Sequence, residues 1–419
     1  MTINELTSKY TEKLKELAVS DFQKNALSNF QARGLPHTKM EDWLYTKLTD
    51  VLPENFDKVS KKGILKNVKL AGKYQIVFLN GAYSKEDSFL PDEVEATLIS
   101  ATELSEKNFI DDKNDIFAML NASANDQILS IKVSKNAQVD DNINIVHLSD
   151  FQESFAMPRT HIEVESFAKV NFVEIFKGND ELSYNQAAVT NFNINDGAIV
   201  THIKVQTEGL NSFHVSSVNA DVKRDALFKT FTFNTGALKA RHNIKVALLA
   251  EGANCSVDGL YAISENQHCD NFSLIDHRMP HTESSQLFKG VLDDKARGVF
   301  TGKVLVQKDA QKVNSEQLNK NLLLSKKAHA DTRPQLEVYA DDVKCAHGAT
   351  VGQLSDEEAF YLQSRGLSRE RVQKLLIHAF CSDAISKLED DKLENFLSEV
   401  LFESFEKKTF EHLDEVKDS

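Results

Sequence analysis

The segment EVESFAKVNFVEI, residues 163–175, contains the unit from which the middle of the chain is built. Apolar and polar residues alternate on both sides of a short polar turn, and Ala168 closes that turn. Alternation with a period of two is typical of a β-strand that has one buried face. The same unit recurs around seven alanines, which are Ala137, Ala168, Ala198, Ala226, Ala253, Ala296 and Ala328.

The spacing of these alanines indicates an internal repeat. Subtraction of successive residue numbers gives spacings of 31, 30, 28, 27, 43 and 32. A period near 30 with short strands predicts a stacked array, and it is too short for a propeller blade of about 40 residues. We therefore expect a β-helix over residues 126–353, in which each coil buries apolar edges that only the next coil can cover. A large β-sandwich of hairpins is the alternative.

The one long gap predicts an insertion between Ala253 and Ala296. The insertion would include NQHCDNFSLIDHRMPHTES, residues 266–284, for which we expect a polar surface loop, with metal binding as the alternative. Its two adjacent candidate ligands would face opposite ways on a strand. The residues in this segment that could bind a metal are His268, Cys269, Asp276, His277 and His281.

The N-terminal region, residues 1–125, is expected to be a mixed domain that begins with two helices. Thr2 and Glu5 form a capping box for the first helix. The second helix is expected to begin near Ser20 and to end at Gly34. The segment 34–46, with the single tryptophan Trp43, is expected to dock its aromatic side chains onto the next domain. Residues 74–79 are predicted to form a strand that ends in an Asn-Gly turn.

The C-terminal region, residues 354–419, changes to helical spacing. Ser355 and Ser368 are predicted to cap two helices, and the first of them is expected to end at Gly366. Apolar residues then recur at helical spacing through residues 372–405. This apolar face either packs as a helical cap on the end of the β-stack or binds another protein.

The composition excludes several classes of function. A formal net charge of −14 argues against a nucleic-acid-binding protein, which would present a basic face. No segment approaches the roughly 18 apolar residues of a membrane span. The first residues lack the apolar core of a signal peptide, so the cytoplasm is the expected compartment. The four cysteines are too few and too scattered for a disulfide framework, and Cys255 and Cys381 lie in apolar contexts typical of a core.

Cys345 and His347 are the residues best placed for chemistry. On a strand their i, i+2 spacing puts both side chains on one face, about 6 to 7 Å apart at the backbone. Thiolate and imidazole suit zinc, copper(I) or iron–sulfur clusters. Two ligands do not complete a tetrahedral site, so the pair is either half of a shared metal site or an ordinary strand end. The sequence has neither a GxxxxGK[ST] phosphate-binding loop nor a GxSxG elbow.

The stretch DDVKCAHGATVGQLSDEEAFYLQSRGLS, residues 341–368, resembles the signature of the SufB/SufD family, the scaffold subunits of the Suf iron–sulfur cluster assembly machinery. Residues 314–345, LPHTKMEDWLYT at 35–46 and LLIHAF at 375–380 are also similar to it. The chain is more similar to the SufD branch, whose form Lys-Cys-x-His-Gly matches residues 344–348. Gly348 stands where SufB-type sequences have a glutamate, and Leu318 stands where they have a functional cysteine.

This resemblance implies a right-handed parallel β-helix core flanked by N-terminal and C-terminal helical domains. It implies a subunit that is not an enzyme and that pairs with SufB through the β-helices. A transient iron–sulfur cluster would form at their interface, with His347 and, less directly, Cys345 as metal-site residues. It also implies that the C-terminal helices bind the SufC ATPase, whose ATP-driven dimerisation strains them and opens the interface. The expected partner-binding residues are Phe360, Tyr361, Leu362, Arg365, Gly366, Leu375, Leu376 and Phe380.

Two other functions are compatible with a β-helix. The first is a carbohydrate-active enzyme, although such proteins are usually secreted. The second is a structural or adaptor protein without a metal role. In isolation the exposed β-helix edge is expected to allow a homodimer.

Overall fold

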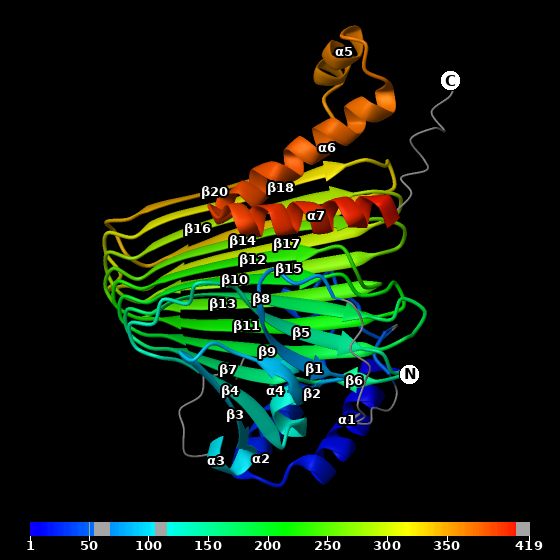
Figure 1. Cartoon of the computed structure of the whole chain (residues 1–419). Coiled ribbons are helices and arrows are strands. Elements are labelled where there is room, and N and C mark those ends of the chain that lie inside the picture. Colours follow the sequence, from blue (N-terminus) through cyan, green and yellow to red (C-terminus); the bar gives the residue numbers. More distant parts are fainter. Residues whose placement is uncertain (50, 54–67, 105–114, 408–419) are drawn as a thin grey trace.

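The computed structural model describes residues 1–49, 51–53, 68–104 and 115–407. Its centre is a parallel β-solenoid, with helices at both ends of the chain (Figure 1). The sequence prediction of a mainly β fold with a β-helix core is therefore confirmed, and the alternative of hairpins in a sandwich is wrong, because the repeated strands pair in parallel. None of the helices in the described ranges is long and apolar enough to cross a membrane.

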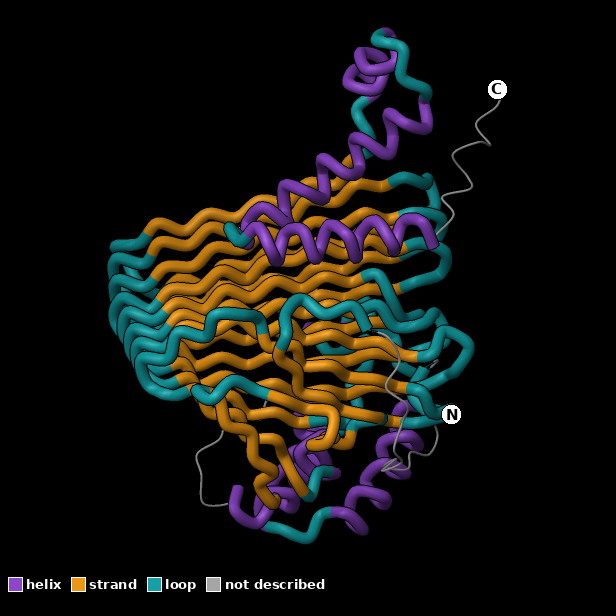
Figure 2. The backbone as a smooth tube through the Cα atoms, in the orientation of Figure 1, coloured by secondary structure: helices purple, strands orange, loops and turns teal. Residues whose placement is uncertain are grey.

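Two sheets form the solenoid (Figure 2), and from β7 (Arg159–Val164) onward successive strands alternate between them. We call them the first and second sheets. The first sheet has the order β2 (Ala82–Phe89), β1 (Tyr74–Leu79), β5 (Ile143–Ser149), β8 (Lys169–Gly178), β10 (Ile199–Gln206), β12 (Leu227–Asn234), β14 (Asn254–Ile263), β16 (Glu283–Leu292), β18 (Asn314–Leu323) and β20 (Lys344–Gly352).

The second sheet runs from the open end of the solenoid to the N-terminal part of the chain. Its order is β19 (His329–Val338), β17 (Arg297–Val306), β15 (His268–His277), β13 (Lys239–Leu248), β11 (Phe213–Val222), β9 (Asn185–Ile194), β7 (Arg159–Val164), β4 (Gln127–Val133) and β3 (Val94–Ser100), and the short β6 (Phe155–Ala156) also pairs with β9. From β8 onward the strands of the first sheet begin at positions 169, 199, 227, 254, 283, 314 and 344, and this regular spacing confirms the repeat.

The predicted insertion between Ala253 and Ala296 does not exist. Ala253 precedes β14 in the first sheet, whereas Ala296 precedes β17 in the second sheet, so the long gap between them is one coil and a half. Residues 266–284 are the end of a turn, strand β15, a second turn and the first two residues of β16, and they are not a surface loop. Thr282 occupies the position before β16 that alanine occupies in other coils, and it is fully buried there. This corner of the coil therefore accepts threonine as well as alanine.

The N-terminal helices cover the outer face of the second sheet. They are α1 (Ile3–Leu17), α2 (Asp21–Arg33), the 3-10 helix η1 (Glu41–Trp43), α3 (Ala101–Leu104) and α4 (Ile116–Ala124). The capping box of Thr2, the cap at Ser20 and the end at Gly34 are confirmed. Trp43 docks as expected: its ring lies 5.6 Å from that of Phe117 and 4.4 Å from the guanidinium of Arg241.

The C-terminal helices are α5 (Asp356–Ser364), α6 (Arg369–Ile385), the 3-10 helix η2 (Ser386–Leu388) and α7 (Asp391–Lys407). The second half of α6, η2 and α7 cover part of the outer face of the first sheet. Leu393 and Leu397 of α7 are fully buried against outward-facing strand residues such as Val205 and Phe233. Each such leucine contributes about 1.5 to 3 kcal/mol on burial. The helices therefore pack on the side of the solenoid and not, as one interpretation of the sequence had it, on its end.

Candidate functional site

The open end of the solenoid is formed by β19 and β20. Each is the last strand of its sheet, so within the described residues neither has a neighbour on its outer side. Most side chains of β20 are exposed, and those of β19 are half-buried. Unpaired strand edges of this kind pair readily with another chain.

Cys345 and His347 both lie on β20 and point toward the inside of the solenoid. They are in register with Ser315 and Gln317 of β18, whose side chains are buried in the interior. In a parallel ladder, residues in register project to the same face. The predicted extended backbone and shared face are thus confirmed, while metal binding stays a prediction. Burial raises the pKa of the half-buried Cys345 thiol, and His347 is exposed.

Side chains in the coils next to Cys345, on the side away from the open end, form a hydrogen-bonded column. Ser315 Oγ lies 2.8 Å from Ser284 Oγ, and Ser284 Oγ lies 2.8 Å from His277 Nε2. The other ring nitrogen of His277 is 2.8 Å from Thr282 Oγ1, and burial lowers the pKa of His277 to about 4. His277 is therefore a neutral hydrogen-bonding group. Among the described residues no three His, Cys, Asp or Glu side chains converge as a metal site.

The remaining candidates from the supposed insertion are dispersed. His268 and Cys269 face opposite sides of β15, as expected for adjacent strand residues. His268 Nε2 lies 2.9 Å from Thr46 Oγ1 in the N-terminal domain, whereas burial in the interior raises the pKa of Cys269 to about 12. Asp276 pairs with Arg278 at 2.6 Å. His281 is exposed in the turn before β16.

The other two cysteines belong to the core. Cys255 is 1% exposed and Cys381 is 0% exposed, which confirms the interpretation of their apolar contexts. Burial raises the pKa of both thiols, that of Cys381 to about 12. Neither thiol is therefore ionised at neutral pH, so neither is a ready nucleophile.

The middle of the solenoid contains a buried polar cluster that the sequence did not reveal. Lys204 is 1% exposed, and its ammonium contacts Ser216 and His242. Burial lowers the pKa of Lys204 to about 7, and it lowers those of His214 and His242 well below the usual value. The Nε2 atoms of both histidines are buried without a hydrogen-bond partner among the described residues.

Two carboxylates border this cluster and behave in opposite ways. Burial raises the pKa of Glu208 to about 7, although Gln206 Nε2 donates to it at 3.0 Å. Burial would also raise the pKa of Glu174, but hydrogen bonds from His147 and His202, at 2.9 and 3.1 Å, lower it well below its usual value. Glu174 is therefore the carboxylate that stays ionised inside the solenoid.

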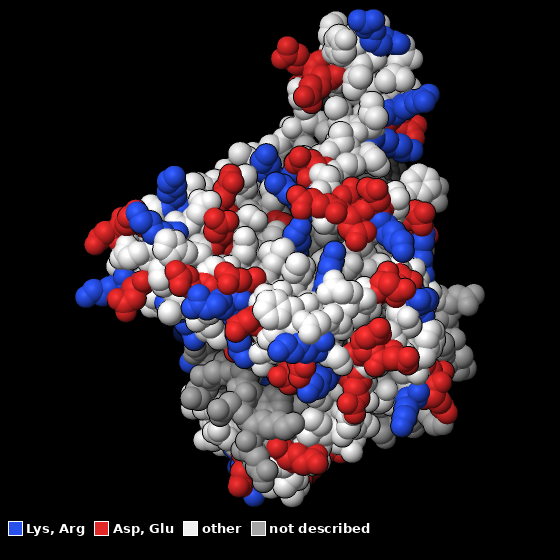
Figure 3. All heavy atoms as spheres, turned by 60° about the vertical axis from the view of Figure 1, so that its left-hand side comes forward, with Lys and Arg blue, Asp and Glu red and all other residues white. Residues whose placement is uncertain are grey.

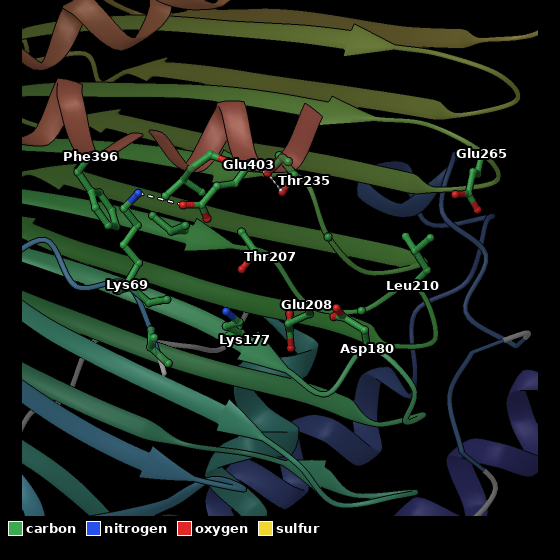
Figure 4. Close-up of a pocket in the computed structure, with 17 residues that line it drawn as sticks. Lys69, Lys177, Asp180, Thr207, Glu208, Leu210, Thr235, Glu265, Phe396 and Glu403 are labelled. Atoms are coloured by element: carbon green, nitrogen blue, oxygen red, sulfur yellow. Dashed lines mark hydrogen bonds and ion pairs between the residues drawn. The ribbon is translucent and has the colours of Figure 1, made fainter. Parts of the chain in front are cut away.

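Glu208 also lines a cavity of about 310 Å³ between α7 and the solenoid. Figure 4 shows Glu208 between Lys177 and Asp180, with Lys69 reaching Glu403 of α7 at 3.0 Å. Ser404 of α7 donates to Thr235 Oγ1 at 3.2 Å. These contacts make the cavity part of the seam along which α7 packs on the first sheet.

The predicted partner-binding residues divide between a free and a docked part of the C-terminal helices. Helix α5 has no buried residue and projects from the body (Figure 1). Phe360 is 73% exposed, Tyr361 58% and Leu375 48%, and Arg365 and Gly366 are also exposed. Leu362 and Leu376 are half-buried.

Phe380 of the same set lies against the solenoid. Its ring is 4.5 Å from the ammonium of Lys289 in β16, and Lys289 donates to the Phe380 carbonyl at 2.9 Å. Lys289 also pairs with Asp383. Phe380 therefore holds α6 to the first sheet, while α5 and the first half of α6 present an uncovered apolar surface, a feature that marks interaction sites.

The surface charge is mixed on the side that Figure 3 shows. Acidic side chains are interspersed with basic ones over the solenoid and around α7 (Figure 3). Such interspersed charge does not form the extended basic surface that nucleic acid requires.

Comparisons with known proteins show what the chain is similar to. Residues 146–380 match the family model of the SufBD core domain of the SUF system for FeS cluster assembly. An iron–sulfur cluster assembly SufBD family protein of Synechocystis is 30% identical over 83% of each chain. The iron–sulfur cluster assembly protein SufD of Escherichia coli is 30% identical over 85% of this chain and 86% of its own. A chloroplastic protein of Arabidopsis thaliana, ABCI7, is 30% identical over 74% of this chain and 66% of its own.

Proposed function

Because the chain belongs to the SufBD family of iron–sulfur cluster assembly proteins, we propose that it is a non-catalytic scaffold subunit that supplies half of a cluster assembly site. The observation that carries this proposal is the position of Cys345 and His347. Both face the interior of the last coil, directly beside an unpaired strand edge. A SufB-type subunit that pairs with β20 would bring its own ligands to this place.

The chemistry of the pair fits a nascent cluster as cargo. A thiolate and an imidazole are ligands that iron in such clusters accepts. Cys345 must lose its proton to bind, and burial raises its pKa, so iron itself would have to displace that proton. His347 is exposed, so an incoming iron ion can reach its ring directly. His347 is therefore the principal ligand in this proposal, and Cys345 the secondary one.

Replacing His347 with alanine is expected to leave the complex with the SufB-type and SufC-type subunits intact but to lower cluster formation at least tenfold. His347 is exposed and contributes little to folding, whereas loss of one ligand removes a cluster attachment point. The measurement is visible absorption and iron and sulfide content of the co-expressed complex. His329→Ala is the matched control, because His329 is an exposed histidine of β19 in the same coil. Normal cluster content in the His347→Ala complex would refute the assignment.

The proposal also assigns the ATPase subunit to the C-terminal helices. Phe360, Tyr361 and Leu375 form the uncovered apolar surface on α5 and α6. Lys289 links α6 to β16, which lies two strands from β20 in the first sheet. A movement of α6 on ATP binding would therefore reach the open end through two neighbouring strands, and the interface with the SufB-type subunit would open.

Phe360→Ala is expected to weaken binding of the ATPase subunit by tenfold or more without changing the melting temperature of the chain. The side chain is 73% exposed, so its loss removes little packing within the chain, whereas large aromatic residues dominate interface energies. Isothermal titration with the SufC-type subunit measures the effect. Phe402→Ala is the control, because Phe402 is 61% exposed on α7. An equal loss in both variants, or none in Phe360→Ala, would contradict the assignment.

A further inference from the structure

A column of side chains leads from the interior of the solenoid to His347. Gln286 of β16, Gln317 of β18 and His347 of β20 are in register, one strand apart. Gln286 is 3% exposed and Gln317 is 0% exposed. His347 is thus the outermost member of a buried polar column, and the two glutamines stand directly behind it.

The hydrogen bonds in this column all run in one direction. Gln286 Nε2 donates to Ser273 Oγ at 2.6 Å, and Gln317 Nε2 donates to Gln286 Oε1 at 2.6 Å. Each amide nitrogen therefore points away from the open end of the solenoid, and each amide oxygen points toward the next residue of the column. Gln317 Oε1 is the last acceptor, and it is buried without a partner among the described residues. The next position toward the open end is His347.

A glycine on the opposite sheet leaves room for the two amides. A Cβ atom at Gly302 of β17 would lie 2.3 Å from Gln317 Nε2 and 2.8 Å from Gln286 Oε1. Only glycine leaves room for the amides at this point, so the arrangement is built into both sheets. In this arrangement Gln317 Nε2 is used by Gln286 Oε1, so Gln317 presents its oxygen on the side of His347.

A buried acceptor without a donor has lost its hydrogen bonds to water and gained none in return, so it favours any arrangement that brings a donor to it. A neutral imidazole has one N–H donor and one lone pair. When His347 donates its N–H to Gln317 Oε1, the acceptor is satisfied and the other ring nitrogen keeps its lone pair for a metal. This is how metal-binding histidines are usually oriented by a group behind them.

We propose that Gln317 is the positioning residue for His347: its side-chain oxygen accepts the imidazole N–H, fixes the tautomer and turns the other ring nitrogen toward the cluster. The inference rests on the proposed function, because it assumes that His347 is a ligand. It adds a residue of the neighbouring coil to the half-site. It also assigns a role to an interior side chain that has no exposed surface of its own.

The test combines a tautomer measurement with cluster formation. The chain is labelled with ¹⁵N-histidine, and the His347 ring signals are identified by their loss in His347→Gln. Gln317→Leu is expected to abolish the preference for one tautomer in the isolated chain and to lower cluster content of the assembled complex about tenfold. Gln317→Glu is expected to keep both the tautomer preference and the cluster content. One carboxylate oxygen accepts from His347, and the other accepts from a reversed Gln286 amide, whose oxygen then accepts from the Ser273 hydroxyl.

Thr332→Val is the control, since Thr332 Oγ1 of β19 is also buried without a partner among the described residues but is not in register with His347. Wild-type tautomer and cluster content in Gln317→Leu would overturn the proposal. So would a Gln317→Glu chain that behaves like Gln317→Leu, or an equal loss of cluster in Thr332→Val. Failure of the proposed function is a different result: His347→Ala would then keep its cluster while the tautomer still depended on Gln317.

Discussion

Lys204→Met is expected to stabilise the chain, by on the order of 2 to 4 kcal/mol at pH 6 and by less at pH 9. The ammonium of Lys204 is enclosed in the middle of the solenoid, and burial lowers its pKa from 10.5 to about 7. Methionine has a similar length and volume without the charge. Methionine also loses the contacts of the ammonium to Ser216 and His242. This loss keeps the gain in unfolding free energy below the amount that the whole pKa shift corresponds to.

The pH dependence follows from the direction of that shift. Below about pH 7, Lys204 is charged in both the folded and the unfolded chain, so the folded chain bears the full cost of burying the charge. Between about pH 7 and 10.5 the unfolded chain binds a proton that the folded chain does not, and stability rises with pH. The advantage of methionine is therefore largest at pH 6 and shrinks as the pH rises toward 10.5.

Urea unfolding of both chains at pH 6 and pH 9 measures this difference. Lys169→Met is the matched control, because Lys169 is exposed at the start of β8 in the same sheet and buries no charge. It is expected to change stability equally little at both pH values. A Lys204→Met chain that is less stable than the parent at pH 6, or that gains the same amount at both pH values, would contradict the expectation.

The position of Lys204 also shows where sequence patterns stop being informative. In β10, residues 199–206, alternation correctly predicts that His202 and Lys204 share one face and that Ile203 and Val205 share the other. It does not say which face is inside. The apolar side chains lie outside, because α7 covers them, and the polar ones lie inside. A pattern confined to one strand contains no information about a helix that packs on it from a distant part of the chain.

The alanine repeat had a similar limit. It located the coils correctly, but it could not distinguish the two corners of a coil, so the change from one corner to the other between Ala253 and Ala296 resembled an insertion. Cys345 and His347 were predicted with the correct strand and shared face, because their spacing depends on the backbone alone. Gln317 was missed as a candidate, because its position behind His347 depends on the register between two strands of successive coils.

The backbone of β20 offers half of its hydrogen-bonding groups to a partner. Lys344 N–H donates to the carbonyl of Val313, the residue just before β18. In a parallel ladder the groups of alternate residues point to the same side. Residues 344, 346, 348, 350 and 352 therefore bond to β18, whereas the N–H and C=O groups of Cys345, His347, Ala349 and Val351 face the open edge. A SufB-type strand that pairs with this edge would bond to His347 and to the residues on either side of it.

Ala349→Pro is accordingly expected to weaken pairing with the SufB-type subunit by more than tenfold while the chain itself stays folded. Proline removes an N–H that faces the open edge, and proline is tolerated at the edge of a sheet where no ladder bond is lost. Loss of one edge donor and the bulk of the ring both oppose a strand that approaches from outside. Analytical ultracentrifugation of the two subunits measures pairing, and a thermal scan measures the fold.

Thr350→Pro separates the edge from the ladder. By the same alternation the Thr350 N–H donates toward β18, so its removal breaks a bond within the sheet and is expected to lower the melting temperature of the chain alone. The two neighbouring substitutions should thus affect different properties: Ala349→Pro mainly weakens pairing, and Thr350→Pro mainly lowers the stability of the chain. If Ala349→Pro pairs normally, the partner does not use the edge of β20, and the half-site must be completed from another direction.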